Sequence, residues 1–507
     1  MDVAEENARL KRREKMLVEV TSMLTQQTEL SDLLERILTR LRSITDSDAG
    51  SLYIVVNHEE LRFAVAQNDS KDIPFSSFTI PLSPETVSGY VAMSGETERF
   101  DDVYAMDPSL PFKFGAGFDK KFGYRTKSMM VVPMKNAKEE VVGVLQLINK
   151  RKAGAVGPIN KDTVDEMVCA YTGDDEDFLW ILAAQAGMAM ERAALYDGIE
   201  KLLQGMIESS SASIESRDKT TAGHSQRIAG YMVALAKRIN KETEDPFWKN
   251  IHYSPVQIRE LFYSALLHDI GKIGVREYVL TKANKLPDAT METIKLRIEL
   301  EIMQDFSKKD EWLEVWEFLE GVNLPVFLTD DKFDRLQEIS EMKVRGINGS
   351  EKLLLSAYEL ENLAVRKGNL TASERVEIES HVAHSLDILK KIPWTDDLKR
   401  VPMIAGTHHE KLSGKGYPLG LVGDDIPFEG RMLSVCDIFE ALTAKDRPYK
   451  KAMPVDKALE ILGFEVKANA LQKEIVDFFI EKKVYNVISD ALRKDFTLSS
   501  DEILALE

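Results

Sequence analysis

Strand-like runs are confined to the first third of this 507-residue chain. They are short, rich in β-branched and aromatic residues, and separated by the Gly, Asp, Asn and Ser residues that turns favour. The expected strands are 51–56, 61–66, 78–82, 129–134 and 141–148. Apolar residues at helical spacing over 30–41 predict a helix ahead of them. This combination predicts an α/β domain with one antiparallel sheet and helices on its faces.

After Ser216 the pattern is nearly all helical. Helical segments are predicted at 224–239, 256–268, 374–392, 398–409 and 431–442. Residues 285–368 differ from their surroundings, because they are charge-dense and contain Trp312, Trp316 and Phe318, and we interpret them as helical inserted material. One long helix, from about Asp175 to about Glu215, is expected to join the α/β domain to the all-α domain.

Small and apolar residues recur every three or four positions along that long helix. They are Leu182, Ala186, Ala189, Ala193, Tyr196, Ile199, Leu203 and Met206. The spacing is similar to a coiled-coil seam and predicts a parallel homodimer. The alternative is that this face packs against the first domain of the same chain.

Composition excludes several classes of protein. The chain has 66 basic and 84 acidic side chains, a net charge of −18, which argues against a partner that is a nucleic-acid polymer. Its longest apolar runs, such as 141–148, are far shorter than the roughly 20 residues of a membrane span, so we expect no membrane association. Cys169 and Cys436 are the only cysteines, which is typical of a protein in the reducing cytoplasm.

Histidines carry the strongest chemical signal, since seven of the eight follow residue 220. His268 and Asp269 stand where an apolar helix should end, and Gly271 is suited to stop it. An imidazole and a carboxylate at one helix end can reach two adjacent metals, with the two oxygens of Asp269 bridging them. Lys272 would place a cation beside the same site. Such ligands suit iron, manganese or zinc better than calcium or magnesium.

The sequence His-Asp followed by Gly-Lys resembles the HD phosphohydrolase superfamily. Residues 408–418, His-His-Glu-Lys-Leu-Ser-Gly-Lys-Gly-Tyr-Pro, are similar to the signature of its HD-GYP branch. The resemblance continues through 437–443 and 446–449 and covers roughly 205–470, less the insertion. It implies a hydrolase that degrades the bacterial messenger cyclic di-GMP, or a related cyclic dinucleotide, to pGpG and/or GMP.

The resemblance also implies a metal centre of two divalent ions, with iron as the expected metal and manganese as the alternative. The first metal would be held by His224, His268, Asp269 and Asp437. The second would be held by Asp269, His381, His408 and His409. A metal-activated hydroxide would attack phosphorus, while Asp269 and Lys272 act in catalysis. Substrate contacts would come from Tyr417, Arg447 and Lys450.

Two positions depart from the family pattern. Members with a third metal carry a glutamate where this chain has Thr220, so a binuclear centre is favoured, with Glu215 or Asp218 as replacement ligands for a third ion. Ser413 replaces a common aspartate. His384 lies one turn after His381 and is expected outside the first coordination sphere.

The first domain resembles a GAF domain, a small-molecule sensory fold. Cyclic-nucleotide-binding members carry an Asn-Lys pair, then a Phe followed by Asp-Glu, and here Asn149, Lys150, Tyr171 and Asp175 occupy the matching positions. The resemblance implies that these residues hold the lid of a ligand pocket. A ligand-free dimerisation scaffold is the competing interpretation.

Together these patterns predict a multidomain protein. Its expected parts are an N-terminal helical extension (1–14), a GAF domain (15–175), a linker and dimerisation helix (176–216), an HD-GYP domain (217–475) with an insertion at 285–368, and a C-terminal helical segment (476–507). The leading function is a GAF-regulated cyclic dinucleotide phosphodiesterase. The alternatives are a catalytically silent dinucleotide receptor and another nucleotide phosphohydrolase of the HD superfamily.

Overall fold

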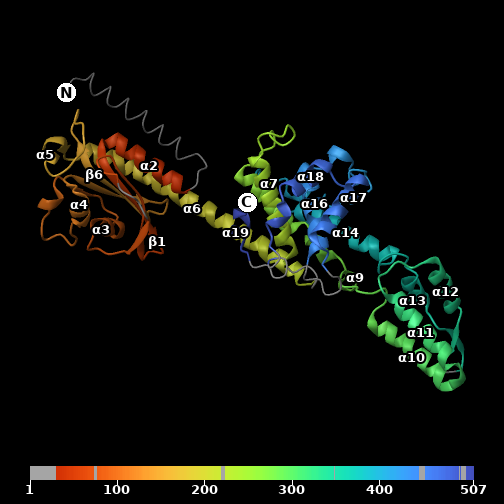
Figure 1. Ribbon diagram of the computed structural model, residues 1–507. Helices are drawn as coiled ribbons and strands as arrows, with labels where there is room; N and C mark the ends of the chain where they lie inside the picture. Colours follow the sequence, from red (N-terminus) through yellow and green to blue (C-terminus); the bar gives the residue numbers. More distant parts are fainter. Residues whose placement is uncertain are drawn as a thin grey trace. The chain divides into compact units, whose positions relative to one another are not determined.

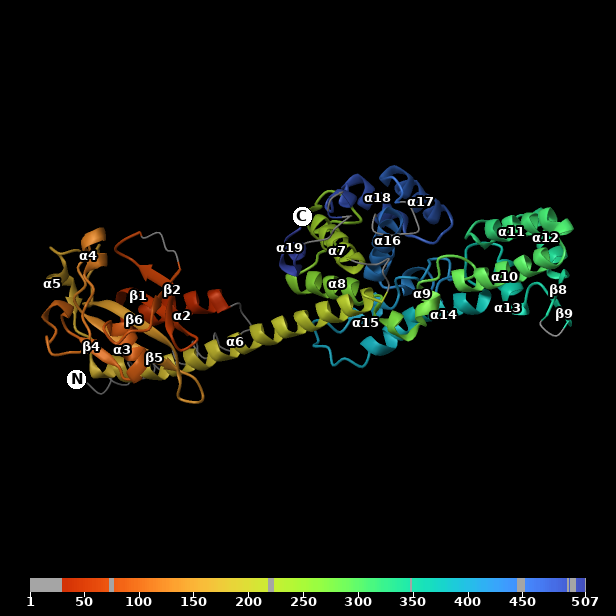
Figure 2. The ribbon, with the colours of Figure 1, turned by 90° about the horizontal axis from the view of Figure 1, so that it is seen from below.

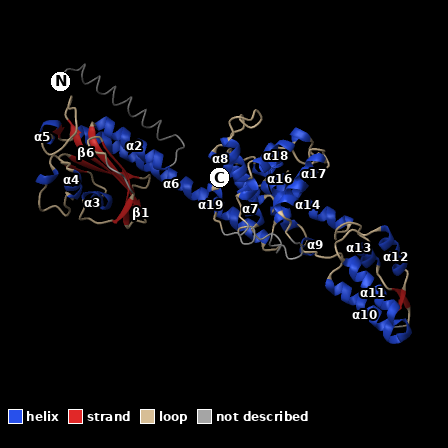
Figure 3. Cartoon of the chain, in the orientation of Figure 1, coloured by secondary structure: helices blue, strands red, loops and turns tan. Residues whose placement is uncertain are grey.

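The computed structural model describes residues 30–72, 77–217, 223–346, 349–444, 452–489, 492 and 498–506 (Figure 1). The chain divides into two compact units, residues 1–202 and 203–507. The predicted extension over 1–14 lies outside the described residues. Strands of the large sheet fall in the first unit, and the second unit is mainly helical (Figure 3). The predicted fold class is therefore confirmed.

One antiparallel sheet forms the centre of the first unit, with strand order β3-β2-β1-β6-β5-β4 and β7 paired to β6. Its strands are β1 (Ser47–Val56), β2 (Glu60–Asn68), β3 (Phe78–Pro81), β4 (Glu98–Phe100), β5 (Met129–Lys135), β6 (Val141–Arg151) and β7 (Val168–Cys169). All five predicted strands are present. The short strands β4 and β7, of three and two residues, were not predicted.

Helices cover both faces of this sheet. Met130 and Val132 of β5 belong to a core shared with α2 (Leu30–Thr45) and the first turns of α6 (Gly173–Glu215). Met129 and Val131 of the same strand belong to a second core under α3 (Val87–Ser94). Because alternate residues of a strand point to opposite faces, both faces of β5 are buried. Shorter helices complete the unit: η1 (Val103–Ala105), α4 (Gly117–Phe122) and α5 (Val164–Met167).

The predicted long helix is α6, and part of its predicted seam is already covered within the chain. Leu182, Ala186 and Ala189 are buried in the core of the first unit. The apolar side chains that α6 leaves exposed in this unit lie mostly at other positions: Trp180, Ile181, Met188, Leu195, Tyr196, Ile199 and Leu202. None of the described helices combines the length and apolar content that a bilayer crossing requires.

Helices of the second unit pack around one large apolar core that includes Tyr231, Phe439 and Phe479. They are α7 (His224–Lys241), α8 (Pro255–Leu267), α14 (Ala372–Leu389), α15 (Val401–Ala405), α16 (Phe428–Thr443), α17 (Val455–Lys467), α18 (Lys473–Glu481) and α19 (Ser500–Ala505). Short turns are η2 (Ile270–Gly274), α9 (Glu277–Leu280), η4 (Gly423–Asp425) and η5 (Val484–Asn486). The helix predicted over 398–409 is shorter than expected, because α15 ends at Ala405, with Gly406 as its C-cap, and the chain turns there.

The segment predicted as an insertion has an apolar core of its own, built around Trp312, Val315 and Leu319. Its helices are α10 (Asp288–Gln304), α11 (Lys309–Asn323), α12 (Asp330–Ser340) and α13 (Ala357–Leu363), with η3 (Phe306–Lys308), and they lie side by side in two views (Figures 1 and 2). A small hairpin of β8 (Lys343–Arg345) and β9 (Glu351–Leu353) was not predicted. The buried Lys282 ammonium lies 2.7 Å from the Glu374 carboxylate of α14 and 2.6 Å from the side-chain oxygen of Asn362 in α13.

Candidate metal centre

Helix ends and turns bring the predicted ligands together in the second unit. His224 is the first residue of α7, His268 and Asp269 follow α8, and His381 lies within α14. The turn after α15 supplies His408 and His409, and α16 supplies Asp437.

Gly271 allows the turn after α8 to approach α14 closely. A Cβ atom at this position would lie 1.9 Å from the His381 carbonyl oxygen, so a larger residue would push the two backbones apart. The buried Ser385 hydroxyl accepts the Gly271 N–H at 2.8 Å and donates to the His268 carbonyl at 2.7 Å. The backbone beside Asp269 is thus fixed against the helix that carries His381.

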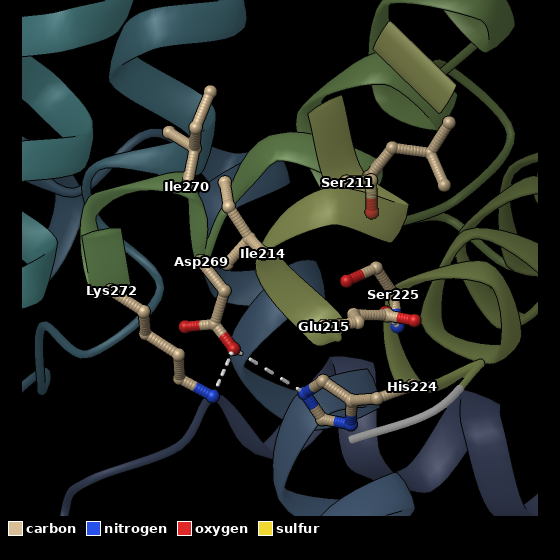
Figure 4. A pocket seen from close by; sticks show the side chains of 9 residues that line it. Ser211, Ile214, Glu215, His224, Ser225, Asp269, Ile270 and Lys272 are labelled. Carbon is tan, nitrogen blue, oxygen red and sulfur yellow. Dashed lines mark hydrogen bonds and ion pairs between the residues drawn. The ribbon is translucent and has the colours of Figure 1, made fainter. Parts of the chain in front are cut away.

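The Asp269 carboxylate lies between two groups of histidines. Its Oδ1 is 3.2 Å from Nε2 of His381. Its Oδ2 is 3.3 Å from Nε2 of His268 and 3.7 Å from Nε2 of His224. The same Oδ2 is 2.8 Å from the ammonium of Lys272, and Figure 4 shows His224 and Lys272 both approaching the carboxylate. One carboxylate can therefore serve both sides of the site.

Three imidazoles share one orientation. Nδ1 of His268 donates to the Ala265 carbonyl and Nδ1 of His408 donates to the Ala405 carbonyl, each at 2.7 Å, while Nδ1 of His381 bonds to the carbonyl of Ile378. The Nε2 atoms of the same three rings are buried and have no hydrogen-bond partner among the described residues. Such a fixed Nδ1–H leaves the Nε2 lone pair to bind a metal.

His224 is oriented by a carboxylate instead. Its Nδ1 bonds to Glu440 of α16, and Glu440 also accepts a hydrogen bond of 2.6 Å from Nε of Arg227. All three side chains are buried. A carboxylate behind a ligating histidine fixes the ring and raises its basicity. Sequence reasoning missed Glu440 as a site residue, although it lies three positions after Asp437 on the same helix.

The charge states suit cation binding. Burial lowers the pKa of His409 to about 4 and holds the pKa of His408 well below its usual value, so both rings are neutral. Burial opposes the ionised form of Asp269, but His268 and Lys272 outweigh it and hold its pKa well below the usual value. Burial likewise disfavours the charged form of His224, yet Glu440 and Asp437 raise its pKa to about 10. The negative potential that retains this proton would equally attract a metal ion.

The ligand atoms form two groups, within each of which they lie within 4.8 Å of one another, close enough to hold a metal ion. The first group is His224, His268 and Asp269, and the second is His381, His408 and His409. These groups are consistent with a binuclear site. Oδ1 of Asp437 lies 3.4 Å from Nε2 of His224, on the side of the first group. His384 is in neither group, and its ring instead faces Gly274.

The residues of the Gly-Tyr-Pro segment lie beside the second group. The Tyr417 ring stacks on His409 with 4.9 Å between ring centroids and 29° between planes. The loop is held by the buried Glu410 carboxylate, which accepts backbone N–H groups from Leu419 at 2.7 Å, Gly420 at 3.1 Å and Leu421 at 3.0 Å. Ser413 forms a β-bridge with Val422. The predicted substrate contacts Arg447 and Lys450, and also Asp218 and Thr220, lie outside the described residues.

Comparison with known families assigns both units. Residues 29–190 match the GAF domain family and residues 358–471 match a family described as HD domain. This chain carries a GAF domain followed by an HD domain. The HD match includes His381, His408, His409 and Asp437, whereas His268 and Asp269 precede it. The predicted order of the two domains is confirmed.

Several curated relatives of the chain are cyclic dinucleotide phosphodiesterases. The chain is 28% identical to 3'3'-cGAMP-specific phosphodiesterase 3 of Vibrio cholerae over 277 residues, which cover 55% of this chain and 38% of that protein. A probable cyclic di-GMP phosphodiesterase of the same species is 24% identical over 56% of this chain and 45% of its own length. The cyclic di-GMP phosphodiesterase response regulator RpfG of Xanthomonas campestris is 36% identical over 20% of this chain and 26% of its length.

The chain thus spans less than half the length of these relatives, and the homology is distant. Among solved structures, the GAF domain of an Acinetobacter phosphoenolpyruvate-protein phosphotransferase covers 38% of this chain and 97% of that chain at 16% identity and a TM-score of 0.26.

The predicted site residues of the GAF domain form an internal network. Lys150 pairs with Asp175, and the Tyr171 hydroxyl is 2.7 Å from the Ser47 hydroxyl. Burial opposes the charged form of Asp175, but the bonds from Lys150 and Thr172 lower its pKa.

Asn149 is fully buried and has a left-handed backbone, with φ of 56°. Its amide donates to the Arg125 carbonyl at 2.9 Å and accepts the Lys127 N–H at 2.7 Å. Its amide nitrogen also lies 3.0 Å from the Tyr124 hydroxyl. In the described structure these hydrogen bonds hold neighbouring segments of the domain together.

Proposed function

We propose that the HD domain of this chain hydrolyses a phosphodiester bond of a cyclic dinucleotide, with cyclic di-GMP as the preferred candidate, to pGpG and/or GMP. The observation that carries the proposal is the position of Asp269, whose two oxygens face different histidine groups at 3.2 Å and 3.3 Å. The dinucleotide substrates named for the distant relatives support the same reaction class.

The residues present fit two divalent cations, because the buried Nε2 atoms of His268, His381 and His408 form no hydrogen bond among the described residues, and the first two lie close to the Asp269 carboxylate. His224, His268, Asp269 and Asp437 would hold one ion, and Asp269, His381, His408 and His409 the other. Bound cations there would supply a water nucleophile at neutral pH and neutralise phosphoryl charge. Iron is the proposed metal and manganese the alternative, since imidazole and carboxylate ligands suit both.

The chain's own residues would bind and orient the substrate. Lys272 lies at the edge of the site with its ammonium held by Asp269, so it would meet a phosphoryl oxygen that approaches this carboxylate. Tyr417 presents a ring fixed on His409, and burial raises its pKa above the usual value, so its hydroxyl stays a hydrogen-bond donor. Arg447 and Lys450 remain proposed contacts to substrate phosphates.

Assembly and regulation form a second part of the proposal. The chain would be a parallel homodimer through α6, using the exposed residues Met188, Leu195, Ile199 and Leu202 in place of the buried part of the predicted seam. The GAF domain would bind a small ligand, with the Lys150–Asp175 pair holding neighbouring segments in place. Calorimetric titration of the full chain with cyclic nucleotides distinguishes a ligand-binding GAF domain from a ligand-free scaffold.

The test of activity is product analysis with cyclic di-GMP and 3'3'-cGAMP, using anaerobically purified protein of measured metal content. The proposal predicts linear products from the wild-type chain and none from a His268→Ala/Asp269→Ala variant. Tight binding without turnover by metal-replete protein would favour the silent receptor. Hydrolysis of linear nucleotides alone would favour a general HD phosphohydrolase.

A further inference from the structure

The last turn of α6 contacts both segments that carry the first ligand group. Ser211 and Ile214 of this turn are buried, and with Glu215 they line a small pocket that also includes His224 and Asp269 (Figure 4). The helix therefore ends against the candidate metal centre.

Glu215 caps the helix that begins with His224. Its Oε2 accepts the Gly223 N–H and its Oε1 accepts the Ser225 N–H, both at 2.9 Å. Gly223 occupies the N-cap position of α7 and has no side chain to accept these bonds. The carboxylate from α6 replaces the usual capping side chain, and its charge is favourable at the N-terminus of a helix.

Arg217, two residues later, binds the turn that follows Asp269. Its guanidinium donates to the Ile273 carbonyl at 3.0 Å and to the Val275 carbonyl at 3.4 Å. These carbonyls belong to the turn containing Gly271 and Lys272 and to the residue after it. One short stretch of chain thus bonds to the backbone on the His224 side and to the backbone on the Asp269 side.

We infer that Glu215 is a positioning residue that sets His224 relative to Asp269, and that the end of α6 thereby controls the affinity of the first metal site. This inference rests on the metal centre of the proposed function. It differs from a role for Glu215 as a ligand of a third ion, because each of its oxygens already accepts a backbone N–H. Any movement of the last turn of α6 would reach His224 through this carboxylate.

The test is a titration of the metal-free full chain with Mn²⁺, followed by electron paramagnetic resonance, for the wild type, Glu215→Ala, Glu215→Gln and Glu208→Gln. Glu208 is the matched control, since it lies on the same helix but bonds to Ser500 of α19. Loss of a group that orients a metal ligand weakens metal binding by roughly 10–100-fold. Glu215→Ala should weaken Mn²⁺ binding at one of the two sites by that factor. Glu208→Gln should leave Mn²⁺ binding at both sites unchanged.

Glu215→Gln should fall between Glu215→Ala and the wild type, because its amide keeps one acceptor for the two N–H groups. If Glu215→Ala fails to fold, as thermal unfolding would reveal, Glu215→Gln serves as the test variant. Unchanged affinity at both sites would overturn the inference. Equal weakening of both sites, or loss of a third Mn²⁺ alone, would also overturn it.

No dinucleotide is present in this titration, so the two proposals can fail separately. A chain that binds two Mn²⁺ ions, shows the selective loss in Glu215→Ala, and leaves cyclic dinucleotides intact would support the positioning role and refute the phosphodiesterase. Turnover of cyclic dinucleotide by the wild type, together with unchanged Mn²⁺ binding in Glu215→Ala, would support the phosphodiesterase and refute the positioning role.

Discussion

Nε2 of His381 and Oδ1 of Asp269 lie 3.2 Å apart, although the whole inserted segment separates them in the chain. The insertion can be large because its ends close on each other, with Lys282 bonded both to Asn362 and to Glu374. The helix that begins beside Glu374 then delivers His381 to Asp269. The metal centre is thus assembled across an insertion that has its own core.

Glu440→Gln should weaken metal binding roughly 10–100-fold, because His224 loses the charged partner that orients its ring. Metal content after dialysis against a weak chelator measures the effect. Glu429→Gln is the control, since Glu429 is also buried on α16 but pairs with Arg400. Equal metal loss in both variants would show that general destabilisation of α16, and not orientation of His224, is responsible.

Glu410→Gln should raise the KM for cyclic dinucleotide more than it lowers kcat. The amide has one acceptor oxygen where the carboxylate has two, so it cannot accept all three N–H groups of 419–421. Each buried N–H group left unpaired costs about 1–3 kcal/mol of stability. The loop that holds Tyr417 would loosen. Steady-state kinetics and chemical denaturation check this, with the exposed Asp424→Asn as control. An unchanged KM would contradict a loop-holding role.

Lys285 should make stability depend on pH. It is fully buried in the insertion, where its ammonium donates to the Leu363 carbonyl, and burial lowers its pKa to about 8. Between that value and the unfolded value of about 10.4, the unfolded chain binds more protons, so stability rises with pH by up to about 3 kcal/mol. Below about pH 8 the folded chain carries the full free-energy cost of burying the charged Lys285 ammonium.

The stability of the wild type relative to Lys285→Met should therefore increase from pH 8 to pH 10 in denaturation experiments. The partly exposed Lys295 is the control, and Lys295→Met should show no such trend relative to the wild type. A parallel pH dependence of wild type and Lys285→Met would show that Lys285 is not titrating in this range.

Periodicity in the sequence was enough to predict the main elements of both units. Runs rich in β-branched and aromatic residues between turn residues located the five longer strands, and helical spacing located α2, α6 and α14. The strands β4 and β7 escaped because two or three residues carry no alternation. The dimer seam predicted on α6 includes residues that are buried within the chain. Leu182 and Ala186 have the same helical spacing whether they face a sheet or a second helix, so the sequence could not separate the two cases.

The candidate site shows a similar division. The motifs that resemble the HD-GYP branch pointed to the histidines and aspartates as ligands. They gave no signal for Ser385 or Glu440, and they suggested Glu215 only as a replacement ligand for a third ion. All three act through hydrogen bonds to residues distant in sequence or to backbone groups. Only the fold brings these partners together.

The most direct test of the central claim, that Asp269 joins two metal ions in a phosphodiesterase centre, is electron paramagnetic resonance of the Mn²⁺-loaded full chain combined with hydrolysis of cyclic di-GMP. The wild type should hold two exchange-coupled ions per chain and release linear product. Asp269→Asn should lose both the coupling signal and the turnover. An Asp269→Asn variant that keeps two coupled ions and hydrolyses cyclic di-GMP at the wild-type rate would contradict the claim.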